Sequence, residues 1–176
     1  MVGTLTAVRI GVVSDTHMPH FGLALPRALV QGLASAHVDR IIHCGDMTDL
    51  LIVALFEAIA PFDGVAGNND GEPIKQRFGR RKVLDVAGAR IGVVHGDGHR
   101  KTTFDRARAA FADDPVDAIL FGHSHRPLCM RRDGTLFVNP GSPTDKRMNP
   151  RYSFATLDVI DGHVEAQLHY YLRRDI

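Results

Sequence analysis

Apolar, β-branched runs alternate with segments of helical spacing through the first 70 residues of the chain. The pattern predicts three buried strands separated by two helices, the second capped by Thr48 and ended before Pro61. In order, the expected elements are a strand at 8–14, a helix at 25–37, a strand at 40–44, a helix at 49–60 and a strand at 62–66. Strands that alternate with helices in this way pair in parallel through right-handed crossovers.

The second half of the chain differs, because short apolar runs there are joined by tight-turn sequences. Asp133-Gly134 and Asp161-Gly162 each separate two such runs, and Ala87-Gly88-Ala89 separates a third pair. These sequences favour antiparallel hairpins. The expected elements are strands at 82–86, 90–95, 118–121, 128–132, 135–139, 152–160 and 164–172, a helix from Thr102 or Thr103 to about Ala112, and a long surface loop at 141–150. No linker divides the sequence, so we predict one domain over residues 1–176.

Composition is that of an ordinary globular protein: 44% of the 176 residues are hydrophobic and the formal charge is +1. Nothing in it indicates general binding to nucleic acid or to a membrane surface. The N-terminus lacks the pattern of a secretory signal, and the longest apolar run, interrupted by Glu57, is too short to cross a bilayer. Cys44 and Cys129 do not form a disulfide framework, so we expect a reduced, cytoplasmic setting. An exposed edge of the C-terminal hairpin would allow a homodimer.

Polar residues that can bind metal ions follow five of the predicted strands, at the point where each strand ends. They are Asp15 and His17, Asp46, Asn68 and Asn69, His95, and His123 and His125. The carboxyl ends of parallel strands gather at one edge of an open sheet, so we expect these side chains to lie together. Residues two apart point the same way in an extended chain, so each Asp/His or His/His pair is expected to approach the metals together. Glycines adjoin these residues and allow sharp turns at a crowded site: Gly45, Gly67, Gly96 and Gly122.

The donor set is mixed, with two carboxylates, four imidazoles and one amide oxygen. Such a set suits Mn²⁺, Fe or Zn²⁺ better than Mg²⁺ or Ca²⁺, which prefer oxygen alone. Seven ligands are too many for one ordinary metal ion but suit two, if one carboxylate bridges. Two divalent ions and two aspartates leave a net positive site, which favours an anionic substrate. Metal ions about 3.5–4 Å apart can activate a bridging water and stabilise the attacking and leaving oxygens of a phosphate ester.

Together these motifs resemble the five sequence blocks of the calcineurin-like metallophosphoesterase superfamily. They read SDTH at 14–17, HCGD at 43–46, GNNDGE at 67–72, HG at 95–96 and GHSH at 122–125, followed by NPGS at 139–142. They are most similar to the small bacterial and archaeal phosphodiesterases of the YfcE type, and also to Vps29, the retromer subunit. The resemblance covers residues 10–142 and implies a four-layer αββα sandwich, with two mixed β-sheets flanked by helices.

The resemblance also implies a role for each motif residue. The implied assignment is Asp15, His17 and His125 on one metal ion, Asn68, His95 and His123 on the other, and Asp46 bridging the two. The implied metal is most often Mn²⁺, with Ni²⁺, Fe or Zn²⁺ as alternatives. Asp46, Asn69 and His123 are the expected catalytic residues, Asn69 by steadying the phosphate.

Two positions depart from the superfamily pattern. Many members carry, at the position of Asn69, a histidine that helps to protonate the leaving group, and asparagine cannot supply that proton. This favours activated diesters over monoesters. Asp97 stands where related sequences often have histidine, and we expect it to hydrogen-bond a ligand histidine instead. Around this core, His43 either orients a ligand or packs in its strand, and Arg126 is a weaker candidate for substrate contact.

Three functions remain open at this point. The preferred one is a metal-dependent phosphodiesterase that hydrolyses small phosphodiesters by a two-metal mechanism. The alternatives are a Vps29-like interaction scaffold with little or no catalysis, and a phosphomonoesterase that uses the same site. All seven ligand positions match the superfamily pattern, which favours catalysis over the scaffold.

Overall fold

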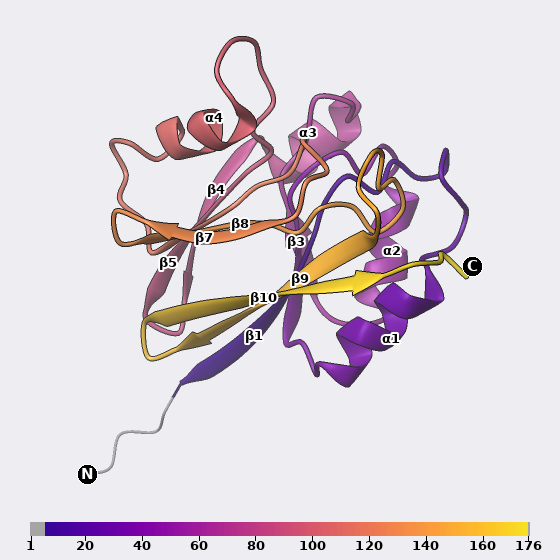
Figure 1. Ribbon diagram of the computed structural model, residues 1–176, viewed down its shortest axis with the longest axis horizontal. Helices are drawn as coiled ribbons and strands as arrows, with labels where there is room; N and C mark the ends of the chain where they lie inside the picture. Colours follow the sequence, from indigo (N-terminus) through magenta and orange to yellow (C-terminus); the bar gives the residue numbers. More distant parts are fainter. Residues whose placement is uncertain (1–5, 176) are drawn as a thin grey trace.

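Two mixed five-stranded sheets pack face to face in the computed structural model, which describes residues 6–175, and helices cover their outer faces (Figure 1). The first sheet has the order β10-β9-β1-β2-β3 and the second β4-β5-β6-β8-β7. The first sheet contains β1 (Ala7–Val13), β2 (Arg40–His43), β3 (Phe62–Gly64), β9 (Tyr152–Ile160) and β10 (His163–Tyr171). The second contains β4 (Arg81–Val86), β5 (Ala89–Val94), β6 (Ala118–Leu120), β7 (Leu128–Arg132) and β8 (Thr135–Asn139). The helices are α1 (Arg27–Ser35), α2 (Leu51–Glu57), α3 (Glu72–Phe78) and α4 (Thr103–Ala109).

Three apolar clusters correspond to the three interfaces between layers. Residues such as Val12 and Leu120 fill the space between the two sheets. Leu29 of α1 and Phe56 of α2 belong to a second cluster, on the outer face of the first sheet. Ala107 of α4 belongs to a third, on the outer face of the second sheet. The four-layer αββα sandwich expected from the sequence is therefore confirmed.

Strand pairing places the ends of the parallel strands where the motifs need them. β1, β2 and β3 pair in parallel, as do β5, β6 and β8, so their carboxyl ends reach a common edge of the sandwich. The hairpins β4-β5, β7-β8 and β9-β10 are antiparallel, as the turn sequences predicted. Each turn has two residues with positive φ, such as Asp133 (51°) and Gly134 (84°), the conformation of a type I′ turn.

The helices differ from the sequence analysis at two points, one element that it missed and one cap that it assigned wrongly. Helix α3 was not predicted, although Pro73 lies in its first turn and Gly79, with φ 70°, ends it. Thr48 does not cap α2, because its φ is 75° and its hydroxyl donates to the carbonyl oxygen of Met18. The carboxylate of Asp49 accepts the backbone N–H of Leu51 instead, at 2.8 Å. Among residues 6–175, none of the helices has the length and apolar character needed to cross a membrane.

Candidate metal centre

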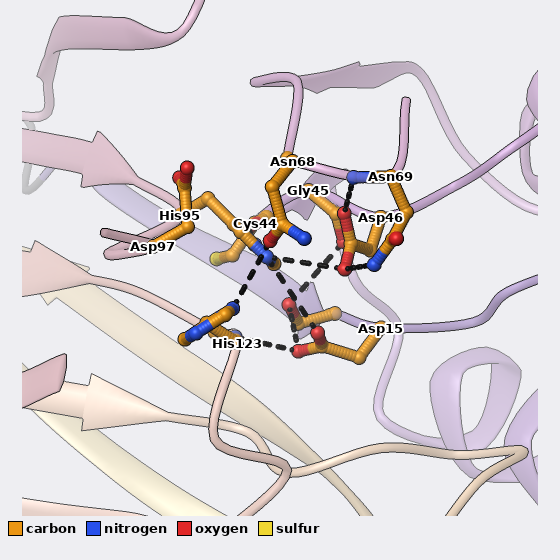
Figure 2. Close-up of polar contacts among 12 residues, drawn as sticks. Asp15, Cys44, Gly45, Asp46, Asn68, Asn69, His95, Asp97 and His123 are labelled. Carbon is orange, nitrogen blue, oxygen red and sulfur yellow. Dashed lines mark hydrogen bonds and ion pairs between the residues drawn. The ribbon is translucent and has the colours of Figure 1, made fainter. Parts of the chain in front are cut away.

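The loops that follow β1, β2, β3, β5 and β6 bring the seven predicted ligands to one place at the carboxyl edge of the two sheets. Figure 2 shows five of these residues facing a common centre: Asp15, Asp46, Asn68, His95 and His123. The ligand atoms form two neighbouring groups.

The first group consists of Asp15, His17 and His125, whose ligand atoms all lie within 4.8 Å of one another. The Nε2 atom of His125 is 3.4 Å from Asp15 Oδ1 and 3.3 Å from His17 Nε2. Two ring nitrogens at this distance, beside a carboxylate oxygen, are typical of a site that holds one cation.

The second group consists of Asp46, His95 and His123, again within 4.8 Å of one another. The oxygen of Asn68 joins them, since its Oδ1 atom is 3.1 Å from His123 Nδ1. Asp46 lies between the two groups, because its Oδ2 atom is 3.2 Å from His95 Nε2 and 3.7 Å from His17 Nε2. This is the position that a bridging carboxylate requires.

Three buried side-chain atoms lack hydrogen-bond partners within residues 6–175, and two of them point into this centre. These two are Oδ1 of Asp15 and Nε2 of His95. Leaving a buried polar atom unsatisfied costs roughly 1–3 kcal/mol, so such pairs of atoms are rare unless they bind something. Two carboxylates and several imidazoles that converge on these atoms fit divalent cations with mixed oxygen and nitrogen coordination.

The rings of two ligand histidines are held from behind by backbone carbonyl groups. His95 Nδ1 lies 2.7 Å from the carbonyl oxygen of Cys44, and His125 Nδ1 lies 2.6 Å from that of Asp145. Each contact places the ring proton on Nδ1 and turns the lone pair of Nε2 toward the centre. The arrangement therefore fixes both the orientation and the tautomer of these two rings.

Five of the seven ligand residues have left-handed backbone, although none is glycine. Their φ angles are 55° for Asp15, 45° for His17, 59° for Asp46, 65° for His123 and 56° for His125. The expectation that pairs two apart would point the same way in extended chain was therefore wrong. Each pair still approaches the centre: Asp15 and His17 lie in one group, and His123 and His125 lie in the two different groups to which the resemblance assigns them. Such strain is uncommon outside functional sites, where the surrounding structure enforces it.

Asn69 holds the carboxylate of Asp46 in place, and Asp70 holds its backbone. The backbone N–H and side-chain Nδ2 of Asn69 donate to the two carboxylate oxygens of Asp46, at 2.8 and 2.7 Å. Asp70 is 2% exposed and accepts the backbone N–H groups of Asp46, Gly67 and Thr48. The geometry thus supports Asn69 as the group that orients Asp46.

Glycine is required at two points by close approach to the ligands. A Cβ atom on Gly67 would lie 2.1 Å from Asp46 Oδ1. One on Gly122 would lie 1.9 Å from Ser14 Oγ and 2.7 Å from Asp15 Oδ2. Both distances are far inside contact range, which explains why these glycines adjoin the motifs.

The segment predicted as a surface loop at 141–150 instead supports the centre with its first half. Residues 141–144 are buried. The Ser142 hydroxyl donates to the carbonyl oxygen of Asp15 at 2.8 Å, and the Thr144 hydroxyl to that of Thr16 at 2.7 Å. The NPGS motif marked this segment, but its contacts depend on the tertiary fold and could not be derived from composition.

Two further expectations have clear outcomes. Asp97 does not bond a ligand histidine; its Oδ2 atom accepts from Arg80 Nη2 at 2.6 Å, so that prediction was wrong. His43 is fully buried and bonds both ligand loops, since it contacts the hydroxyl of Thr16 at 3.1 Å and accepts the N–H of Gly45 at 3.1 Å. Burial lowers the pKa of His43 to about 3, so the ring is neutral.

Without cations, protons compensate the paired carboxylates. Burial raises the pKa of Asp15 to about 7. Burial alone would lower the pKa of His95, but the Asp46 and Asp15 carboxylates outweigh it and raise that pKa to about 9. Burial likewise acts to raise the pKa of Asp46, yet His95 and Asn69 bring it below its usual range. A cation would therefore replace a proton at this centre, because metal ligands bind in their deprotonated forms.

This fold, with two Asp/His groups at its carboxyl edge, defines a metallophosphoesterase. A sequence model of the calcineurin-like phosphoesterase superfamily domain matches residues 8–162, so the chain belongs to that superfamily. It is 36% identical over 164 residues to a probable metallophosphoesterase of Methanocaldococcus jannaschii, covering 90% of this chain and 79% of that protein. It is 26% identical over 148 residues to a phosphodiesterase of the same organism, covering 76% and 83%. Vps29 from Chaetomium thermophilum has the same fold, with a TM-score of 0.75 at 23% identity, covering 93% of this chain and 97% of that one.

Proposed function

We propose that this protein is a two-metal phosphodiesterase that hydrolyses small phosphodiesters, with Mn²⁺ as the metal in a cytoplasmic setting. The observation that carries the proposal is the Asp46 carboxylate between two groups of ligand atoms, 3.2 Å from His95 and 3.7 Å from His17. Ni²⁺, Fe and Zn²⁺ also suit these donors. We also predict that the protein forms a homodimer.

Some residues of the centre would hold the cations, and others would orient the residues that hold them. Asp15, His17 and His125 would hold one ion, Asn68, His95 and His123 the other, and Asp46 both. When bound, two divalent ions lower the pKa of water and neutralise charge that develops on the phosphate oxygens. Asp15 and His95 form the buried floor of the centre, whereas Asn68 is exposed and His123 is partly exposed. The substrate therefore approaches from the side of Asn68 and His123.

The surroundings of Asn69 favour diesters with good leaving groups. Its N–H and Nδ2 groups are both directed at Asp46, and an amide has no proton to give to a departing alkoxide. A leaving group that departs as a stable anion needs no such proton. The phosphodiesterase of Methanocaldococcus jannaschii is among the relatives that support this choice.

The direct test is hydrolysis of bis-p-nitrophenyl phosphate by the metal-free protein after addition of Mn²⁺. We expect turnover for the wild type and a loss of at least about 100-fold for Asp46→Asn, because removing a ligand costs more than removing a residue behind one. Asp49→Asn, an exposed aspartate on the same loop, is the matched control. Circular dichroism of each variant checks the fold. Absence of turnover with Mn²⁺, Ni²⁺, Fe²⁺ and Zn²⁺ would refute the proposal.

Fold similarity to Vps29 keeps the scaffold function as a second candidate. The two candidates differ in what they require of the centre, because a scaffold has no need of turnover. Fewer than one metal ion per chain after loading with Mn²⁺, together with no turnover, favours the scaffold. A phosphomonoesterase is separated by comparing p-nitrophenyl phosphate with the diester, and we expect the diester to be faster.

A further inference from the structure

A cavity of about 550 Å³ adjoins the metal centre, between the start of α4 and the loop that leads from β6 to β7. Its lining includes Thr103, Phe104, Phe121, Ser124, Arg126 and Leu128. The volume is in the range of sites that bind small molecules, about 300–1,000 Å³. The assigned metal ligands are not part of this lining.

One wall of the cavity continues directly from the ligand loop. Ser124 stands between His123 and His125, and Arg126 follows His125. The side chain of His123 is partly exposed, whereas His125 is buried. A group attached to a phosphate at the second ligand group is therefore next to this wall.

The opposite wall is fixed to the loop after His95. The methyl group of Thr103 packs against Gly96, since it lies 3.0 Å from where a Cβ on that glycine would be. Arg106 locks the two together, donating from Nε to the carbonyl oxygen of Gly96 at 2.8 Å and from Nη2 to the hydroxyl of Thr103 at 3.1 Å. Both walls are thus positioned by the loops that carry His95 and His123.

The chemistry of the lining suits a flat ring that carries hydrogen-bonding groups. Phe104 and Phe121 meet edge to face, with their centroids 6.4 Å apart. Phe121 is buried, so the half-buried Phe104 gives the cavity its accessible aromatic ring. The guanidinium of Arg126 is exposed and makes no ion pair within residues 6–175. The Ser124 hydroxyl oxygen accepts from the Arg126 N–H and from Asn139 Nδ2, which leaves its own O–H available as a donor. Arginine stacks on heteroaromatic rings, and aromatic side chains stack on nucleobases.

We propose that this cavity binds the non-leaving alcohol of the diester and that this alcohol is a nucleoside. The proposal rests on the phosphodiesterase function proposed above and deepens it. In the reaction, water adds its oxygen to phosphorus and the P–O bond to the other ester oxygen breaks. The leaving group departs as a stable anion and the two protons of the water pass to solvent, so the retained product is a nucleoside monophosphate. Arg126 and Ser124 are then specificity-determining residues that contact the nucleoside.

The test compares two substrates with the same leaving group, the p-nitrophenyl ester of thymidine 5′-monophosphate and methyl p-nitrophenyl phosphate. For the Mn²⁺-loaded wild type we expect kcat/KM to favour the thymidine ester by about tenfold or more, mainly through KM. Arg126→Ala and Ser124→Ala should each reduce this ratio by about fivefold. Arg40 is exposed at the start of β2, at the other end of the strand from Asp46. As the control, Arg40→Ala should leave both rates unchanged.

The outcomes separate this proposal from the one on which it rests. A wild-type ratio near one refutes the nucleoside cavity while leaving the phosphodiesterase intact, and so does a ratio that both variants leave unchanged. Absence of turnover for both substrates refutes the phosphodiesterase and the cavity with it. Thermal unfolding of each variant confirms that a changed ratio reflects recognition and not loss of fold.

Discussion

Replacing Asp70 by asparagine tests how strongly the fold depends on the hydrogen-bond network behind Asp46. Oδ2 of Asp70 accepts the backbone N–H groups of Asp46 at 2.8 Å and Gly67 at 2.7 Å. Oδ1 accepts the N–H of Thr48 at 2.7 Å. An asparagine of the same shape keeps one acceptor oxygen for the first two, but it turns an NH₂ group toward the N–H of Thr48.

The expected loss follows from those three bonds. A hydrogen bond to a charged group contributes about 1.5–3 kcal/mol and a neutral one about 0.5–1.5 kcal/mol. Losing one charged bond and weakening two others by about 1 kcal/mol each gives a loss of about 3.5–5 kcal/mol in the free energy of unfolding. That is a large fraction of the roughly 5–15 kcal/mol that stabilises a typical domain. Asp70 is 2% exposed, so water does not replace the lost partner.

Urea unfolding of the metal-free protein, followed by far-UV circular dichroism, measures this loss directly. Asp49→Asn is the matched control, because Asp49 is exposed and asparagine can still accept its single bond from Leu51. We expect the control to change the free energy of unfolding by less than about 0.5 kcal/mol. A loss below about 1 kcal/mol for Asp70→Asn would contradict the reasoning.

Further predictions concern the ligands and their supports. Gly122→Ala, whose Cβ would lie 1.9 Å from Ser14 Oγ, should weaken Mn²⁺ binding by at least about tenfold in calorimetry, and wild-type affinity would argue against the close approach. Asn69→Ala removes the 2.7 Å bond to Asp46 and should lower kcat/KM for bis-p-nitrophenyl phosphate by about 10–100-fold; unchanged activity would exclude the supporting role. In the metal-free protein the pKa of His95 is about 9 against 6.5 for an ordinary histidine, so the folded state holds a proton that the unfolded chain releases. Its Tm should fall from pH 7 to 9 and saturating Mn²⁺ should remove the trend, whereas a rising Tm without metal would oppose this assignment.

The hydrophobic pattern predicted most of the fold because the two sheets depend on local alternation and turn chemistry. Buried runs such as 40–44 and the Asp133-Gly134 turn need no tertiary information to be recognised. Helix α3 was missed because only Ile74 and Phe78 give it buried apolar positions, too few to show helical periodicity. The prediction that Thr48 caps α2 was wrong because the Thr48 hydroxyl donates to the carbonyl oxygen of Met18, thirty residues away in the chain.

The candidate site was predictable in its residues but not in its backbone. The order of the motifs was enough to predict that the seven candidate ligands lie together, with Asp46 between the two groups. The left-handed conformation of His123 and His125 is not a local preference of histidine, and the surrounding structure imposes it. The predicted partner of Asp97 was also wrong because tertiary structure decides it: the observed partner, Arg80, comes from a different part of the chain.

Anomalous diffraction from crystals of the Mn²⁺-loaded protein tests the central claim most directly. We predict two peaks about 3.5–4 Å apart, the separation typical of two-metal sites. One peak should lie among Asp15, His17 and His125, the other beside His95 and His123, with Asp46 contacting both. A single peak, or two peaks that Asp46 does not join, would contradict a two-metal centre in this protein.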